Sequence, residues 1–193
     1  MRYEKGHKQE TRRKVIETAA HRFRKHGIEA TGVAALMAEA GLTHGGFYAH
    51  FPSKEALTAE AVCAAFENSR LFFAGETGEK PTLKKFIARY LSARHRDHPE
   101  LGCVAAALAS EVSRQSPKVR ARFTESFQEA VALVSQGLPA TIRGQARAER
   151  ALAILSLMIG ALQLARAVDN PALSESLLKQ GRQSALQLAG IKK

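Results

Sequence analysis

Apolar residues recur every three or four positions along most of the chain, which is the pattern of amphipathic α-helices. In residues 8–26 one face collects Val15, Ile16, Ala19, Ala20 and Phe23. Similar patterns predict longer helices at residues 53–73, 82–97, 99–114, 117–138, 148–168 and 171–189. No segment has the period of two that marks a strand. The sequence therefore predicts an all-α fold.

Between the first two long helices, the pattern predicts two short helices joined by a glycine turn. Thr31 stands where it would cap the first, whose inward positions are Val33, Leu36, Met37 and Ala40. Gly41 follows, and glycine accepts the left-handed backbone that ends a helix in a tight turn. Thr43 is a second candidate cap, which opens a helix that continues to about residue 49.

An aromatic and basic cluster comes directly after this turn. Phe47 and Phe51 have the spacing to hold the second short helix against the first. Three polar side chains are then left to point outward, namely Tyr48, His50 and Lys54. Pro52-Ser53 breaks the chain, and Ser53 can cap the next long helix. This is the layout of a helix-turn-helix with groups that can grip a DNA backbone.

Charge supports a polyanionic partner. The formal net charge is +11 and the isoelectric point is near 10.1. About half of the excess lies outside the first 54 residues, so charge alone does not locate the contact. No run approaches the 18 uncharged apolar residues of a membrane span, and the N-terminus lacks the apolar core of a signal peptide. The protein is predicted to be cytoplasmic.

Residues 41–57 read GLTHGGFYAHFPSKEAL. The order of a glycine turn, a short helix, F-Y-x-H-F and S-K-E-x-L resembles the DNA-binding domain of the TetR family of transcriptional regulators. The resemblance is strong over residues 8–57 and architectural beyond them. It implies that phosphates are contacted by Thr31, Thr43, Tyr48, His50 and Lys54. It further implies that His44, followed by Gly45, faces base edges in the major groove.

Two glycines depart from the family pattern. Gly46 stands where a small side chain is common, and Gly32 replaces a common polar residue. Each internal glycine costs a helix about 1 kcal/mol relative to alanine. Gly45 and Gly46 therefore predict a recognition helix that is soft until it docks, with sequence choice depending more on His44, the N-terminal arm and DNA shape.

The last two predicted helices offer a dimer interface. Seven residues nearly surround the first of them: Ala151, Leu152, Leu155, Met158, Ile159, Leu162 and Ala165. An ordinary core helix pair would have the same pattern. The resemblance implies a homodimer through residues 148–168 and 171–189, and two modules spaced about 34 Å apart can read a palindrome.

The chain has two cysteines, of which Cys103 is the candidate sensor. Cys63 lies in an alanine-rich helix and is explained as a small buried apolar residue. Cys103 follows a Gly near a predicted helix start, after Arg94, His95, Arg96 and His98. Positive charge and a helix N-terminus favour the reactive thiolate. Simple packing is the alternative. The Gly-Cys pair resembles one TetR branch, some of whose members sense oxidants or electrophiles by cysteine.

Other inputs and activities have weaker support. An apolar ligand pocket would be lined by Phe86, Leu108, Val112, Phe123 and Phe127, although these residues would also make an ordinary core. A metal site at His95, His98 and Cys103 is disfavoured by Pro99 and the nearby arginines. An enzyme with Cys103 as nucleophile lacks an orienting third residue. A non-specific nucleic-acid coating protein would bind scrambled sequences equally well.

The sequence thus predicts a DNA-binding domain at residues 1–52 and a helical sensing and dimerisation domain at 53–193. The predicted function is that of a repressor released from a palindromic operator by a small-molecule or thiol-reactive inducer. The alternative within this class is a regulator that activates, or one with no effector. No catalytic residue, metal or cofactor is predicted.

Overall fold

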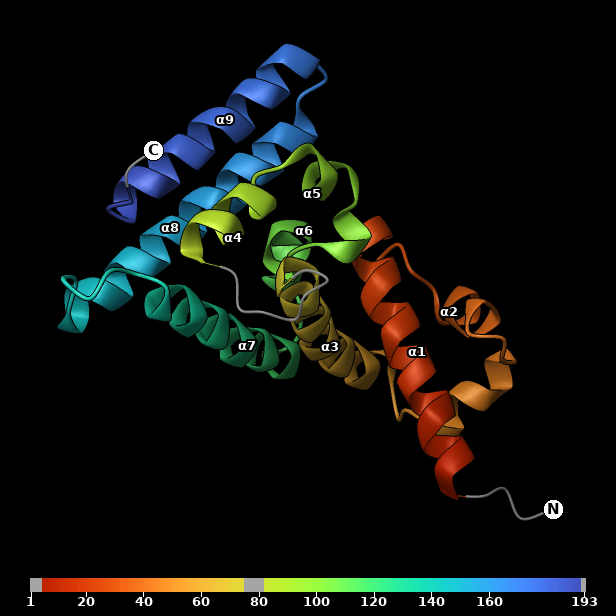
Figure 1. Cartoon of the computed structure of the whole chain (residues 1–193). Coiled ribbons are helices and arrows are strands. Elements are labelled where there is room, and N and C mark those ends of the chain that lie inside the picture. The colour runs from red at the N-terminus through yellow and green to blue at the C-terminus, as the bar shows by residue number, and fades with distance from the viewer. Residues whose placement is uncertain (1–4, 75–81, 192–193) are drawn as a thin grey trace.

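A computed structural model describes residues 5–74 and 82–191. The described residues form helices and connecting turns without a strand, so the predicted all-α class is confirmed. Residues 75–81, between the predicted helices 53–73 and 82–97, lie outside the described residues, as do residues 1–4 at the N-terminus. Figure 1 shows the N-terminal helices at one end of the molecule and the last two helices at the opposite end.

Three helical elements form the N-terminal module. Helix α1 spans Lys5–His26, α2 spans Val33–Glu39 and the 3₁₀-helix η1 spans His44–Ala49. Helix α3, Lys54–Ala74, then leads away from the module and packs between α1 and α7 (Figure 1). The side-chain hydroxyl of Ser53 accepts a hydrogen bond from the N–H of Ala56 at 3.1 Å, which confirms Ser53 as the cap of α3.

Two predicted helices of the C-terminal half are each divided in the structure. The segment 82–97 forms α4, Leu83–Tyr90, and α5, Ala93–Asp97. Ser92 interrupts them in an extended conformation and caps α5 through the N–H of His95. The segment 99–114 forms a 3₁₀ turn η2, Pro99–Leu101, and α6, Val104–Val112. Gly102 is extended between them, so a continuous helix is wrong here.

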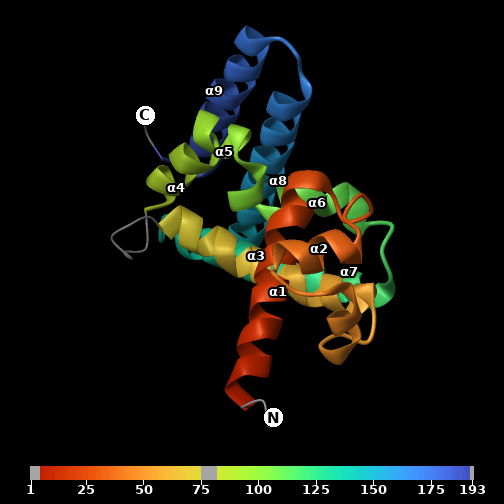
Figure 2. The same cartoon turned by 90° about the vertical axis from the view of Figure 1, so that its right-hand side faces the viewer.

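The remaining helices are α7, Pro117–Gln136, α8, Gly144–Ala167, and α9, Pro171–Leu188. Helices α8 and α9 run side by side, as both views show (Figures 1 and 2). Among the described residues, α8 is the helix long and apolar enough to cross a membrane by length and composition alone, although it packs against α9, α7 and α6. Only a third of its apolar window is buried within the chain.

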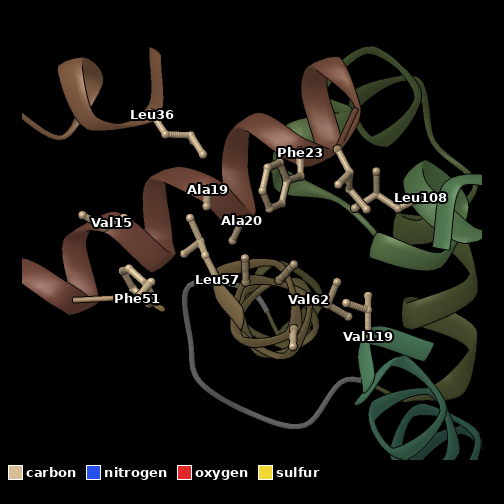
Figure 3. Close-up of a cluster of buried hydrophobic side chains, with 14 of the residues drawn as sticks. Val15, Ala19, Ala20, Phe23, Leu36, Phe51, Leu57, Val62, Leu108 and Val119 are labelled. Atoms are coloured by element: carbon tan, nitrogen blue, oxygen red, sulfur yellow. The ribbon is translucent and has the colours of Figure 1, made fainter. Parts of the chain in front are cut away.

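The hydrophobic core does not break at residue 53. One cluster of buried side chains joins α1, α3, α6 and α7, with Phe23, Leu57, Leu108 and Val119 among its members (Figure 3). A second cluster joins α4 with α8 and α9. The N-terminal module and the C-terminal helices therefore share one continuous core.

Candidate nucleic-acid interface and regulatory site

The turn between α2 and η1 has the geometry that the sequence predicts. Gly41 adopts a φ of 76°, in the left-handed region. Its N–H donates to the carbonyl of Ala38, and the N–H of Leu42 donates to the carbonyl of Met37 at 2.8 Å. These two bonds make a Schellman motif, which closes the end of α2 and directs the chain into η1.

The second short helix is a 3₁₀-helix rather than an α-helix. Thr43 precedes it, but its side chain makes no capping hydrogen bond, so the predicted cap is wrong. A 3₁₀-helix of six residues is unusually long, because its hydrogen-bond geometry is poorer than that of an α-helix. The space around Gly45 is open, and a Cβ on Gly46 would be in ordinary contact with Met37 and Thr43. The fold itself therefore does not require these two glycines.

Aromatic packing fixes which side of η1 faces outward. Phe47 and Phe51 are both 1% exposed and stack with their ring centroids 5.7 Å apart. Tyr48 lies edge-on to Phe47 and is 71% exposed. Thr43, His44 and Gly45 are exposed on the same short element. The structure thus presents a contiguous polar and aromatic tip whose base is held in the core.

Thr31 is not part of this surface, contrary to the sequence prediction. It is fully buried, and its hydroxyl donates to the carbonyl of Gly27 at 2.7 Å. The cap position of α2 is occupied by Gly32, which offers no side chain, so the predicted cap at Thr31 is also wrong. The side chain of Thr31 closes the turn after α1, and this leaves no hydroxyl for a phosphate contact.

His50 and Lys54 lie beside the exposed tip and are partly buried. The ammonium group of Lys54 donates to the carbonyl of Ile28 at 2.8 Å. Burial lowers the pKa of His50, and the positive charges of Lys8 and Arg12 lower it further. Arg12 packs its guanidinium 4.7 Å from the centre of the Phe51 ring and pairs with Glu60. A phosphate that approaches here would meet several cationic groups.

Cys103 lies at the junction of the two halves, immediately before α6, and is partly exposed. Tyr90 is buried nearby, and burial, together with the neighbouring Cys103, raises the pKa of its hydroxyl. Two cationic side chains lie nearby, the buried Arg24 and the partly buried Arg166. Burial lowers the pKa of Arg24 to about 10 and lowers that of Arg166, while a negative Cys103 opposes both shifts.

The backbone around Cys103 is held by a buried imidazole. His95 is fully buried, its Nδ1 lies 2.7 Å from the carbonyl of Tyr90, and its Nε2 accepts the N–H of Cys103 at 2.9 Å. A carbonyl can only accept, so Nδ1 carries the proton and the ring is neutral. Burial lowers the pKa of His95 to about 3. A Cβ on Gly102 would stand 2.1 Å from Nε2, so the glycine makes room for the ring.

The five predicted pocket residues do not line one cavity. Leu108 and Val112 are buried in the first cluster, with Phe123 and Phe127 packed against it, whereas Phe86 packs against the second cluster. Two pockets among the described residues, of about 460 and 420 Å³, lie elsewhere and include none of the five. The first pocket lies where α5 meets the α8–α9 connection. The predicted apolar pocket is therefore wrong for this conformation, because these side chains fill the core.

Neither histidine joins Cys103 in a cation site. His95 uses both ring nitrogens inside the protein, and His98 is exposed and pairs with Glu100 at 3.2 Å. Over residues 5–74 and 82–191, no group of three or more His, Cys, Asp or Glu side chains is placed to hold a metal ion.

Two family profiles match the chain. The profile described as bacterial regulatory proteins of the tetR family matches residues 15–61, which hold the helix-turn-helix. A second, described as the C-terminal domain of LmrA/YxaF-like transcriptional regulators, matches residues 81–178, about half of the chain. The chain belongs to the TetR family of transcriptional regulators. It is therefore a DNA-binding transcription factor and not an enzyme, and regulators of this family act as dimers.

Individual relatives agree with this assignment. The HTH-type transcriptional regulator YerO of Bacillus subtilis is 40% identical over 52 residues, which are 27% of this chain and only 18% of that protein. A TetR regulator from Chloroflexus aurantiacus is 28% identical, with a TM-score of 0.70 and 96% and 95% of the two chains covered. The reduced form of Escherichia coli NemR is 22% identical, with a TM-score of 0.69 over 92% and 96%. The NemR likeness shows a shared fold.

The polar cluster around Cys103 is what sequence reasoning missed in this TetR regulator. Three different helices supply Arg24 and Ser69, which donate to the Gly102 carbonyl, and Arg166, which donates to the His95 and Arg96 carbonyls. Nothing in their local sequence marks these partners. The predicted cluster of Arg94, Arg96 and His98 proves to be largely peripheral, with Arg94 and His98 exposed and Arg96 paired with Asp97. The available sequence signal was the position of Arg24, which falls beside the apolar face of its helix that carries Phe23.

Proposed function

We propose that this TetR regulator is a homodimeric repressor that binds a palindromic operator and is released by a thiol-reactive inducer. The observation that carries the proposal is the position of Cys103. It is partly exposed and directly follows Gly102, whose carbonyl accepts a hydrogen bond from Arg24 on α1 of the DNA-binding module. A partly exposed thiol beside this contact can be reached by electrophiles and oxidants, and a modification there alters the segment that Arg24 holds.

The outer face of α8 and α9 supports dimerisation. Leu152, Leu164 and Leu173 are between 47% and 56% exposed. Gly160 sits in the middle of α8 with no atom within 4 Å of a Cβ built on it. A mid-helix glycine costs about 1 kcal/mol relative to alanine, and this chain alone gives no reason for it. A second copy packed closely on α8 supplies that reason and also explains the apolar character of the helix without a bilayer.

The small DNA-contacting surface of one module also favours a dimer. The exposed tip consists of Thr43, directly before η1, and of His44, Gly45 and Tyr48 within it. This surface is too small for sequence-specific binding by one module alone. Two tips placed about one helical turn of DNA apart read two half-sites related by a two-fold axis. Phosphate contacts then supply much of the affinity, so binding falls steeply with salt. Because its operator is bacterial DNA, the protein is placed in the cytoplasm by this proposal.

The reaction at the sensor is a simple addition. With an electrophile such as a maleimide, the sulfur of Cys103 forms a bond to one alkene carbon, and the neighbouring carbon takes up a proton. The adduct adds bulk at Cys103, directly before α6. The added bulk displaces the Gly102–Cys103 segment, whose carbonyl accepts a hydrogen bond from Arg24 on α1.

The experiment has two stages. First, purified protein is mixed with sheared DNA from its source genome at about 150 mM salt, where non-specific binding is weak, and the retained fragments are sequenced. Enrichment of one palindrome is expected; retention without a shared motif contradicts the proposal.

Second, the selected palindrome is titrated with protein treated with N-ethylmaleimide. Release is expected for wild type and for Cys63→Ser, whereas Cys103→Ser should remain bound to the operator after the treatment. Release that persists in Cys103→Ser rules out this cysteine as the sensor.

A further inference from the structure

Arg24 is a residue of the DNA-binding module whose charged group lies in the regulatory half. It is 5% exposed and extends from α1 toward the segment before α6. Its Nη1 donates to the carbonyl of Gly102 at 3.0 Å and also approaches the Ala65 carbonyl and the Ser69 hydroxyl. Its Nε donates to the carbonyl of Ala20 at 3.0 Å. All of these acceptors are neutral, so the buried charge depends on their staying in place.

The peptide between Gly102 and Cys103 is held from both sides. The carbonyl of Gly102 accepts from Arg24 and, at 2.7 Å, from the hydroxyl of Ser69 on α3. The N–H of Cys103 donates to His95, which is itself fixed against the Tyr90 carbonyl. Since the imidazole is fully buried, the segment cannot shift toward His95. A displacement away from the imidazole is therefore passed to Arg24 and Ser69, which hold the other side of the peptide.

We propose that Arg24 is the positioning residue that transmits the state of the Gly102–Cys103 segment to the DNA-binding module. When the segment shifts, the guanidinium follows its acceptor or loses it, and α1 moves in either case. This rests on the proposed regulatory function but does not depend on which inducer acts. This role sets Arg24 apart from a second polar contact between α6 and the module. In that contact Glu111, at the far end of α6, accepts the N–H groups of Ile28 and Glu29.

A double-mutant cycle tests the transmission without any inducer. Gly102→Ala forces the segment to move, because its Cβ would stand 2.1 Å from His95 Nε2. Affinity for the selected operator is measured for wild type, Gly102→Ala, Arg24→Met and the double variant. Gly102→Ala should weaken binding about tenfold when Arg24 is present and less than threefold in the Arg24→Met background. Methionine keeps the length of the buried stem but removes the guanidinium.

Glu111→Gln is the matched control, because it weakens the second interdomain contact and leaves the Gly102 carbonyl alone. In that background Gly102→Ala should still weaken binding about tenfold. If Arg24 has a merely structural role, Gly102→Ala should reduce operator affinity by the same factor in the wild-type, Arg24→Met and Glu111→Gln backgrounds. Equal reductions in all three, or no reduction in any of them, overturn the proposal.

A second perturbation covers the case in which Gly102→Ala does not fold, which thermal unfolding shows directly. Cys103→Met enlarges the neighbouring side chain, and the same cycle with Arg24→Met is then read in the same way.

Alkylation with N-ethylmaleimide separates the two proposals, and it is applied to Cys63→Ser protein with and without Arg24→Met. If alkylation leaves operator binding intact but the cycle shows coupling, the thiol inducer is wrong and the role of Arg24 stands. If alkylation releases DNA equally from both proteins, the role of Arg24 is wrong and the thiol inducer stands.

Discussion

The carboxylate of Glu111 accepts a hydrogen bond from the backbone N–H of Ile28 at 2.7 Å, which joins α6 to the turn that follows α1. The same oxygen accepts the N–H of Glu29 at 3.2 Å. Gly27 takes a φ of 91° in this turn, and a Cβ there would stand 2.6 Å from the carboxylate. Together with the Arg24–Gly102 contact, the pair fastens α6 to the DNA-binding module at both ends.

Removal of this carboxylate is expected to destabilise the protein. Glu111→Ala leaves the N–H groups of Ile28 and Glu29 without their acceptor, at a cost of about 1–3 kcal/mol in the free energy of unfolding. Urea unfolding at fixed protein concentration measures it. Glu125→Ala, which removes an exposed pair with Arg122, is the matched control and should stay within about 0.5 kcal/mol of wild type. Similar losses in both variants would show that the Glu111 contact carries no special weight.

The two threonines of the module should behave in opposite ways. Thr31→Val removes a buried hydrogen bond to Gly27 and should lower the free energy of unfolding by about 1 kcal/mol with operator affinity unchanged. Thr43→Val alters an exposed side chain and should weaken operator binding with stability unchanged. Thermal unfolding and fluorescence anisotropy with the selected operator measure the two effects. A loss of affinity without a loss of stability in Thr31→Val would restore it as a DNA contact.

The buried imidazole predicts how stability changes with pH. The pKa of His95 is lowered from 6.5 to about 3, so the unfolded chain takes up a proton first as the pH falls. The stabilising contribution of a neutral His95 is complete above pH 6.5 and is lost toward pH 3, at up to about 1.4 kcal/mol per pH unit. Urea unfolding at about pH 7.5 and about pH 5.0 measures the slope.

His95→Gln should have the shallower slope, although it is also less stable at neutral pH. His98→Gln replaces an exposed histidine and should follow wild type. If His95→Gln and wild type lose stability in parallel between these two pH values, the buried neutral ring is not the origin of the dependence.

The exposed leucines of α8 give a direct test of the dimer interface. Leu164→Glu places a charge on a residue that is 56% exposed in the single chain, so it should fold and yet remain monomeric in sedimentation velocity. Leu133→Glu changes a leucine on α7 that is 36% exposed and should remain dimeric. A dimeric Leu164→Glu protein would locate the interface elsewhere.

Sequence reasoning was most successful where local chemistry determines structure. Gly41 marked the turn because a left-handed residue was needed, and Phe47 and Phe51 marked the inner face because their spacing matched one turn. It was less successful where tertiary contacts decide. Thr31 could equally serve as a cap or as a buried hydroxyl, and only the packing of the Gly27 turn selects the second.

Contacts distant in sequence were beyond its reach. Ser92 and Gly102 each divide a helix that the apolar pattern predicted as continuous, because Ser92 caps α5 and Gly102 must leave room for His95. The meeting of Arg24 with Gly102 spans 78 residues, and no periodicity encodes it. The resemblance over residues 8–57 located the helix-turn-helix, which the family profile confirms, whereas the contacts around Cys103 became visible only in the folded chain.

The central claim is tested most directly by the affinity of the protein for its selected palindrome, for one half-site and for a scrambled sequence, at about 150 mM salt. Two modules that read two half-sites predict an even number of protomers on the palindrome. They also predict weaker binding to the half-site by at least about tenfold, and binding to the scrambled sequence weaker by about a thousandfold or more. Equal affinity for all three would mean that net positive charge governs binding, and the account of a dimeric, sequence-specific repressor would be wrong.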